Sequence, residues 1–266
     1  MLFDVKDLLR RNDVTALLPH VTHDVADILQ EFLQDRHDWP GFARIDKPSQ
    51  LAAIIDHTLL KPTASVDDIR VLCEQAVANR FKSVCVNPTY VMQCAYALDG
   101  SGIEVCTVVG FPLGATTTIA KAVETTRAIA DGATEIDMVV NQGDVLGGHW
   151  DDVIDDVRAV CDASGGALVK VIIETCNLNM NAKVGACVAA ALGGADFVKT
   201  STGFAASGAT AEDISLMRLV VGAGLGVKAS GGIRSTDDAL TMVAAGANRI
   251  GASASIAIVE GFKAIN

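Results

Sequence analysis

From about residue 50 to the end of the chain, short β-rich runs alternate with amphipathic helical stretches, and this alternation constrains the fold most. Repeated strand–helix units favour a parallel sheet covered by its helices. Several helical stretches carry start and stop signals, such as Ser65 before an acidic turn and Gly246 after the last apolar position. We expect strands at 52–55, 83–86, 103–109, 135–140, 168–173, 196–199, 227–229 and 249–250, and helices at 66–79, 89–98, 117–131, 150–162, 180–192, 211–221 and 236–245.

Eight such units in one chain predict an α/β fold of the (β/α)8 TIM-barrel type. The rival fold, a doubly wound open sheet, would need only about five or six strands. The glycine-rich run at 222–226 is superficially similar to a dinucleotide-binding loop. It precedes a strand instead of following one, so we interpret it as a helix-to-strand turn.

The first 45 residues lie outside this alternation. Residues 1–38 contain no glycine, and apolar positions such as Val25, Leu29 and Phe32 recur at helical spacing up to the break at Trp39-Pro40. We therefore expect an N-terminal helical extension over 1–45 and a (β/α)8 barrel domain over 46–266. The apolar stripe of the extension must cover its own barrel or another subunit, and we favour its own barrel.

Composition excludes several classes of protein. Half of the 266 residues are hydrophobic and only 5% are aromatic, which excludes intrinsic disorder and predicts a core of small aliphatic side chains. The net charge of -11 argues against nucleic-acid or anionic-membrane partners. The chain shows no signal-peptide pattern and no uncharged run long enough for a membrane span. Its seven scattered cysteines are typical of a reducing compartment, so we expect a cytoplasmic protein.

Charged residues near the ends of the expected strands are the main functional signal. Barrel strands are buried on both sides, so a charge there needs a reason, and catalytic groups of barrels gather at the carboxyl ends of strands. A buried ion-pair network that fills a polar interior is the alternative explanation. Residues two apart share a face, as Glu135 and Asp137 do. The charges concerned are Asp56, Asp137, Lys170, Glu174, Lys199 and Lys228.

Lys199 and Lys228 end consecutive strand-like runs, and each precedes a turn of small residues that contains glycine. Burying two ammonium groups close together is costly. Burial and a neighbouring like charge both lower the pKa of an ammonium group, so that one of two such lysines can lose its proton. A neutral lysine amine attacks carbonyl carbon and forms a Schiff base, which predicts carbonyl chemistry.

Glycine turns after the last two strands indicate an anion site. Gly231 and Gly232 precede a helix start, and Gly251 and Ser253 follow the last strand. Bare backbone N–H groups at such places bind phosphate, and the loops after strands seven and eight are the common phosphate site of these barrels. Turns without a binding role would also use glycine, but two such loops at the expected strands favour phosphate.

Eight ordered motifs make the chain resemble the deoxyribose-phosphate aldolases, a family of metal-independent class I aldolases. Together they span about residues 50 to 262, nearly the whole expected barrel. Any one of them alone would be weak, whereas their combination in this order is specific. The motifs are IDHTLLKP (55–62), SVCVNP (83–88), VGFPLG (109–114), EIDMVVN (135–141), VKVIIET (169–175), FVKTSTGF (197–204), VKASGGIR (227–234) and RIGAS (249–253).

The resemblance implies a reversible cleavage of 2-deoxy-D-ribose 5-phosphate to D-glyceraldehyde 3-phosphate and acetaldehyde, in deoxyribonucleoside catabolism, without metal or cofactor. It implies Lys199 as the Schiff-base lysine and Lys228 as the second lysine, which keeps the first neutral and takes part in proton transfer. Asp137 falls on the catalytic carboxylate, which moves protons with Lys228 through a water. The family commonly forms homodimers. The implied substrate- and phosphate-binding positions are Asp56, Cys85, Gly203, Gly231, Gly232 and Ser253.

Two positions depart from the family pattern. Phe204 stands where some members have a lysine near the phosphate, and Ala254 stands where some have a second serine. We therefore expect phosphate binding to depend more on backbone N–H groups than on side-chain charge. We interpret Cys85 as a packed or pocket-lining thiol and not as a nucleophile, because no histidine partner is near it in sequence.

Three other functions stay open at this point. The first is a Schiff-base aldolase or transaldolase for a different phosphosugar. The second is a phosphosugar isomerase, in which Asp137 or Glu174 would shuttle a proton and no imine would form. The third is a non-catalytic protein that binds sugar phosphates, although mere binding has no use for a neutral lysine.

Overall fold

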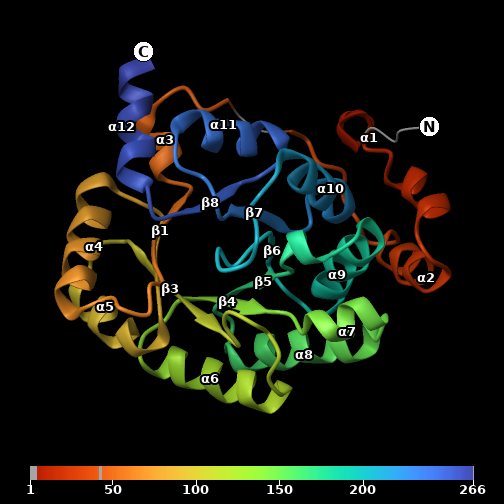
Figure 1. Cartoon of the computed structure of the whole chain (residues 1–266), viewed down its shortest axis with the longest axis horizontal. Coiled ribbons are helices and arrows are strands. Elements are labelled where there is room, and N and C mark those ends of the chain that lie inside the picture. Colours follow the sequence, from red (N-terminus) through yellow and green to blue (C-terminus); the bar gives the residue numbers. More distant parts are fainter. Residues whose placement is uncertain (1–4, 42–43, 266) are drawn as a thin grey trace.

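The computed structural model describes residues 5–41 and 44–265, and its centre is a closed barrel of eight parallel strands. Each strand pairs with the next one in sequence, and β8 closes the ring by pairing with β1 (Figure 1). The predicted (β/α)8 barrel is confirmed. The strands are β1 (Ile55–Leu59), β2 (Ser83–Val86), β3 (Glu104–Val109), β4 (Glu135–Val139), β5 (Leu168–Ile172), β6 (Phe197–Lys199), β7 (Gly226–Ser230) and β8 (Arg249–Ala252).

Seven strands lie within two residues of their predicted bounds, but the prediction for the first strand was wrong. Ala52, which was expected to open that strand, is the last residue of the single-turn helix α3 (Pro48–Ala52), and residues 53 and 54 form a turn. The strand itself runs through the polar stretch from Asp56 to Thr58. Polar residues fit there because the barrel interior is charged, and Asp56 pairs inward while His57 faces Gln75 of the covering helix.

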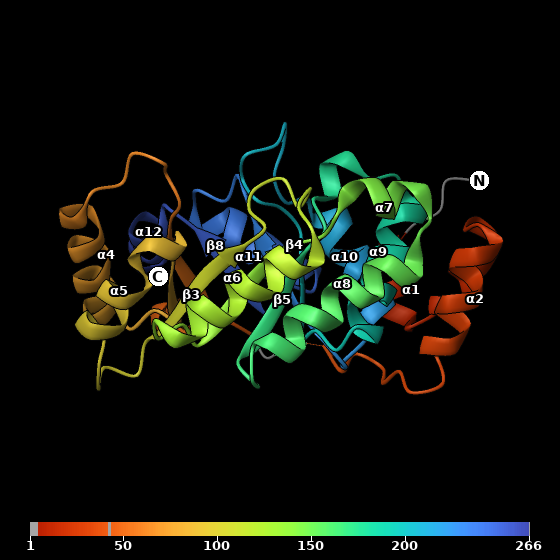
Figure 2. The same cartoon turned by 90° about the horizontal axis from the view of Figure 1, so that it is seen from below.

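The helices form a ring around the strands (Figures 1 and 2). Four of them match their predicted bounds residue for residue, namely α4, α9, α10 and α11. The predicted cap at Ser65 is confirmed, because its hydroxyl accepts a hydrogen bond from the Asp68 N–H. The helices after α3 are α4 (Val66–Asn79), α5 (Val91–Ala97), α6 (Thr118–Ala130), α7 (Gln142–Gly147), α8 (Trp150–Ala163), α9 (Met180–Leu192), α10 (Ala211–Val221), α11 (Thr236–Ala245) and α12 (Ser255–Ile265), with short 3-10 turns η2 (Pro88–Tyr90) and η3 (Thr175–Asn177).

The N-terminal extension lies outside this ring and packs on its own barrel (Figure 1). It consists of α1 (Val5–Arg11), the 3-10 helix η1 (Val14–His20) and α2 (His23–Phe32), instead of one continuous helix. The chain breaks at Asn12, which has a left-handed φ of 52°. Helix α1 packs on α10 and α2 packs on α9, with Val25 and Leu29 fully buried. Beyond α2, the Arg36 guanidinium donates to the Leu219 carbonyl at 2.9 Å.

Helix α9 shows how the extension and the ring depend on each other. Its sequence, MNAKVGACVAAAL, is apolar on nearly every side, and that pattern suits a helix covered on both faces. Trp150 of α8 packs against Gly185, where a Cβ would lie only 2.4 Å from the indole ring. The same indole N–H donates to Asp24 of α2 at 2.7 Å, so one side chain joins three helices.

The apolar core lies between the outward faces of the strands and the helices, whereas the barrel interior is largely polar. Outward residues such as Val84, Ile136 and Val198 are fully buried under the ring. No helix in the described parts of the chain is long and apolar enough to cross a bilayer.

Candidate active site

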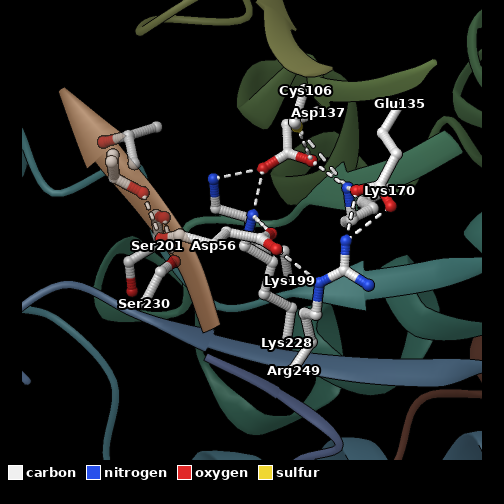
Figure 3. A network of polar contacts seen from close by, with 12 residues as sticks. Asp56, Cys106, Glu135, Asp137, Lys170, Lys199, Ser201, Lys228, Ser230 and Arg249 are labelled. Atoms are coloured by element: carbon white, nitrogen blue, oxygen red, sulfur yellow. Dashed lines mark hydrogen bonds and ion pairs between the residues drawn. The ribbon is translucent and has the colours of Figure 1, made fainter. Parts of the chain in front are cut away.

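A network of buried charges fills the barrel interior (Figure 3). It draws on six strands, because alternate residues of each strand point inward. No member is more than 4% exposed. The members are Asp56 (β1), Glu135 and Asp137 (β4), Lys170 (β5), Lys199 (β6), Lys228 (β7) and Arg249 (β8).

Asp137 is the centre of the network. Its Oδ2 lies 2.7 Å from the Nζ of Lys199 and 2.7 Å from the Nζ of Lys228, so the contact with each lysine is direct. Its Oδ1 lies 3.0 Å from the Nζ of Lys170 and accepts from the Cys106 thiol at 3.2 Å. Burial alone would raise the pKa of Asp137, but the three ammonium groups hold it well below its ordinary value. Asp137 is therefore an ionised carboxylate, and both of its oxygens accept hydrogen bonds from neighbouring side chains.

A deeper layer holds the lysines in place. Glu135 contacts both Lys170 and Arg249, and Asp56 contacts both Lys228 and Arg249. Burial works against the ammonium of Lys228, but Asp137 and Asp56 outweigh it and raise its pKa well above the ordinary value. In the same way, carboxylate neighbours outweigh burial and raise the pKa values of Lys170 and Arg249.

The network holds four basic side chains and three carboxylates among the described residues. With every group ionised, one positive charge would be left without a carboxylate in a buried site. Such an excess is unfavourable, and the loss of one proton removes it.

A cavity of about 300 Å³ opens above the network, and Lys199 is the only one of its seven charged members among the lining residues. Three glycines with left-handed φ values between 79° and 86° line the cavity, and Ser253 follows β8 at the same place. A left-handed backbone favours glycine, and the missing side chains leave N–H groups open to a ligand. Those glycines are Gly203, Gly231 and Gly232.

The structure brings most of the predicted site residues together. Lys199, Lys228, Asp137 and Asp56 share the network, while the three glycines and Ser253 line the cavity above. Asp56 and Cys85 are fully buried and are not among the residues that line the cavity, and their role in substrate binding stays a prediction.

Sequence reasoning missed several residues of the site. Arg249 opens β8 and was assigned no role, although it shares a face with Gly251 two residues on, which is a signal for the barrel interior. Lys61 and Arg234 also line the cavity and bring positive charge to it. Positive side-chain charge therefore lies at the same cavity as the glycine turns for which we expect mainly backbone N–H binding of phosphate.

Cys85, Cys106 and Asp137 form one candidate cluster of metal-ligand atoms, which lie within 4.8 Å of one another in the described chain. The surroundings do not suit a cation. The Lys170 nitrogen lies 3.5 Å from the Cys106 sulfur, and Lys199 and Lys228 already contact Asp137. Burial also raises the pKa of the Cys106 thiol well above its ordinary value.

The fold and the comparisons together define an aldolase, a lyase built on a (β/α)8 barrel. The model of the DeoC/LacD aldolase family matches residues 50–262, and the chain belongs to this family.

Individual relatives agree with the family match. The chain is 56% identical over 207 residues to the deoxyribose-phosphate aldolase of Streptococcus mutans, which covers 78% of this chain and 94% of that protein. It is 58% identical over 213 residues to the deoxyribose-phosphate aldolase of Bacillus subtilis, and this match covers 79% of this chain and 95% of that protein. The solved deoxyribose phosphate aldolase of Aeropyrum pernix, a tetramer, superposes with a TM-score of 0.78 at 35% identity, covering 90% of this chain and 98% of that one.

Proposed function

We propose that this aldolase reversibly cleaves 2-deoxy-D-ribose 5-phosphate to D-glyceraldehyde 3-phosphate and acetaldehyde through a Schiff base on Lys199. The observation that carries the proposal is the position of Lys199, at the boundary between the charged network and the cavity. Its amine is the group of the network that a substrate carbonyl reaches first. The names of the relatives support the choice of substrate.

The proposed attack on a carbonyl needs Lys199 as a neutral amine, and the network has one more basic side chain than it has carboxylates. Raised pKa values keep protons on Lys170, Lys228 and Arg249, and three carboxylates balance these three charges. Lys199 is the remaining basic group. An amine without a proton carries the lone pair that attack on a carbonyl requires.

The first half of the reaction uses that lone pair. The Lys199 nitrogen attacks C1 of the open-chain sugar, the carbonyl oxygen takes up a proton, and water leaves to give the imine. Lys228 lies next to Lys199 across the β6–β7 pair and is a suitable proton donor for this step, because Asp137 contacts both nitrogens.

In the second half of the reaction a carbon–carbon bond breaks. A base removes the proton of the C3 hydroxyl, the C2–C3 bond breaks to release glyceraldehyde 3-phosphate, and the electron pair of that bond forms the C1–C2 double bond as the protonated imine nitrogen takes up the electrons. The resulting enamine is then protonated at C2, and water releases acetaldehyde from Lys199. Asp137 and Lys228 are the proposed acid–base pair for these transfers, and because neither lines the cavity they act on the substrate through a water.

The phosphate group fits the glycine-lined end of the cavity. Backbone N–H groups at Gly203, Gly231 and Gly232 are the proposed donors, and Lys61 and Arg234 add positive charge. This end is also the N-terminal side of α11, whose dipole favours an anion.

The cavity disfavours a phosphosugar isomerase. An isomerase of that kind needs a carboxylate that reaches substrate carbon, but no aspartate or glutamate lines the cavity. Asp137 lies beneath the lysines, and Glu174 is engaged by Thr202.

We further propose that the reaction serves deoxyribonucleoside catabolism in the cytoplasm. The sugar phosphate it consumes is the product of deoxyribonucleoside breakdown, and the seven cysteines, all free thiols, suit a reducing compartment. A homodimer remains our expectation from the family resemblance.

Product analysis tests the proposed activity. The purified protein is incubated with deoxyribose 5-phosphate, and acetaldehyde and glyceraldehyde 3-phosphate are measured separately. We expect equal amounts of both, and no turnover by Lys199→Ala with an unchanged circular dichroism spectrum. A ketose phosphate without acetaldehyde would instead identify an isomerase.

A further inference from the structure

Glu174 occupies an unusual place at the edge of the site. It lies two residues after the end of β5 and directly before η3, is only 2% exposed, and has a left-handed φ of 57°. Left-handed backbone is strained for a glutamate and persists where surrounding contacts hold it. The network described above does not include this residue, and the proposed reaction gives it no role.

The hydrogen bonds of the Glu174 carboxylate go to one residue, Thr202, in the loop that follows Lys199. Its two oxygens accept from the Thr202 N–H at 3.2 and 3.3 Å, and Oε2 also accepts from the Thr202 hydroxyl. No basic side chain of the described chain forms an ion pair with it. A buried carboxylate held only by neutral donors binds them strongly, since nothing else offsets its loss of water.

These hydrogen bonds continue along the loop. The Thr202 hydroxyl oxygen accepts from the Phe204 N–H at 3.1 Å. The N–H groups of Thr202 and Phe204 therefore both have acceptors, whereas no acceptor in the described chain takes the N–H of Gly203 between them. Gly203 lines the cavity, so it presents the one donor of this segment that is left for a ligand.

The opposite side of the loop is held by β7. The Thr200 hydroxyl donates to the Ser230 carbonyl and accepts from the Ser230 N–H, both at 3.1 Å, and the Ser230 hydroxyl donates to the Ser201 carbonyl at 2.6 Å. Those contacts fix residues 200 and 201, next to Lys199. At Thr202, the residue immediately before Gly203, the Glu174 carboxylate accepts from both the backbone N–H and the hydroxyl.

We propose that Glu174 is a positioning residue that acts through Thr202 to hold the Gly203 N–H in place for the substrate phosphate. The inference rests on the proposed function, because it assigns one donor of the phosphate end. It separates two tasks within one loop: Ser230 supports the part that carries the reactive lysine, and Glu174 supports the part that recognises the anion.

The test compares 2-deoxyribose 5-phosphate with 2-deoxyribose in Glu174→Gln. The amide keeps the size of the side chain but cannot accept at both positions. Loss of a charge-assisted hydrogen bond predicts a KM for the phosphorylated sugar about tenfold higher with little change in kcat. We expect kcat/KM for unphosphorylated deoxyribose to change by less than about twofold, because Lys199 keeps its own supports. An equal loss with both sugars would mean a merely structural role and would overturn the proposal.

Two further variants keep the test decisive if Glu174→Gln does not fold. Thr202→Val removes the hydroxyl while leaving the carboxylate, and should raise the KM for the phosphorylated sugar in the same selective way. Thr202→Ser retains the hydroxyl and should restore the wild-type KM. Failure of the serine variant to do better than valine would also contradict the role of this hydrogen bond.

Glu124→Gln is the matched control. Glu124 also accepts from a backbone N–H, that of Gly110 at 2.7 Å, but neither residue lines the cavity. It should leave the ratio of the two substrates unchanged. The proposed function is judged separately on the wild type: a wild type without aldolase activity refutes that function, whereas an active wild type whose substrate ratio survives Glu174→Gln refutes only the positioning role.

Discussion

Lys199 and Lys228 are directly paired on neighbouring strands β6 and β7, and both side-chain nitrogens lie 2.7 Å from one oxygen of Asp137. The pairing register of the two strands brings these two side chains to the same carboxylate. Lys199, the proposed nucleophile, lines the cavity, whereas Lys228, the proposed proton donor, does not.

Replacing Asp137 by asparagine should damage both activity and stability. An amide cannot act as a base, and we expect kcat to fall by about 10²–10⁴-fold. Removing one partner from a buried ion network costs about 3–5 kcal/mol in the free energy of unfolding. Steady-state kinetics and urea unfolding measure the two effects.

The control for this change is Asp155→Asn. Asp155 forms an ion pair with Arg158 on the surface, where its side chain is 69% exposed. Such pairs contribute about 0–1 kcal/mol, so neither quantity should change much. A stable, active Asp137→Asn protein would be incompatible with the central place of Asp137.

The network should also shape the pH dependence of stability. Asp137 has a folded pKa well below 3.8, so its contribution is complete above that value and is lost as the pH falls toward the folded pKa. Lys228 has a folded pKa well above 10.5, so its contribution is complete below that value and is lost as the pH rises through the folded pKa. Urea unfolding across this range should therefore show a plateau with an acid limb and an alkaline limb.

Lys228→Met should reduce the alkaline limb, because the group that titrates there is gone. Lys82→Met serves as the control, since Lys82 forms only a partly exposed pair with Glu104 at 3.7 Å. An alkaline limb of the same size in Lys228→Met and wild type would show that Lys228 does not contribute in this way.

Gly232→Ala should weaken recognition of phosphate. No atom lies within 4 Å of a Cβ built at this position, so the protein can hold the methyl group, which would enter the cavity. We expect a higher KM for deoxyribose 5-phosphate and little change for deoxyribose. Gly165→Ala matches it as a control, because Gly165 also has a positive φ and open space but lies outside the cavity. Equal effects of the two substitutions would indicate backbone strain alone.

We propose that residues 1–45 form an extension separable from the barrel at 46–266. Curated relatives are matched over 94–95% of their own length, while the family match begins at residue 50. A variant lacking the first 45 residues should keep aldolase activity but unfold at a lower temperature, since the surface of α9 and α10 becomes exposed. Calorimetry and kinetics on the same sample test this division. Loss of all activity in a folded truncated protein would contradict it.

A single substitution tests the packing of the extension on the barrel without removing residues 1–45. Leu29→Ala removes a fully buried side chain of α2 and should cost about 2–5 kcal/mol without changing kcat. Val123→Ala, at a position 63% exposed, should cost far less. A similar small cost at both positions would mean that the extension is only loosely packed.

Much of the fold was predictable because the hydrophobic periodicity and the residues that start and end helices agree along the barrel. Helix α4 begins where Ser65 caps it and could be placed to the residue. The apolar run at 52–55 predicts the first strand too early in the chain. Around Asp56 the inward side of the strand faces charges, so a polar sequence forms β1, while Ala52 ends α3.

The residues of the site were likewise predictable only in part. Lys199 and Lys228 were predictable, since a lysine at a buried strand position is rare and needs a purpose. Arg249 was overlooked because one basic residue at the start of a strand resembles a solvent-exposed end. Its contacts with Asp56 and Glu135 depend on how the barrel closes between β8 and β1, which no local pattern contains. The left-handed backbone of Glu174 likewise follows from its three-dimensional contacts.

Trapping the imine tests the central claim most directly. Deoxyribose 5-phosphate is added to the wild-type protein with sodium borohydride, and peptides are mapped by mass spectrometry. Reduction of the imine should attach the sugar-derived group to Lys199 alone, with no adduct in Lys199→Ala. An adduct on Lys170 or Lys228 in the wild type, or turnover without any adduct, would contradict the assignment of Lys199 as the Schiff-base residue.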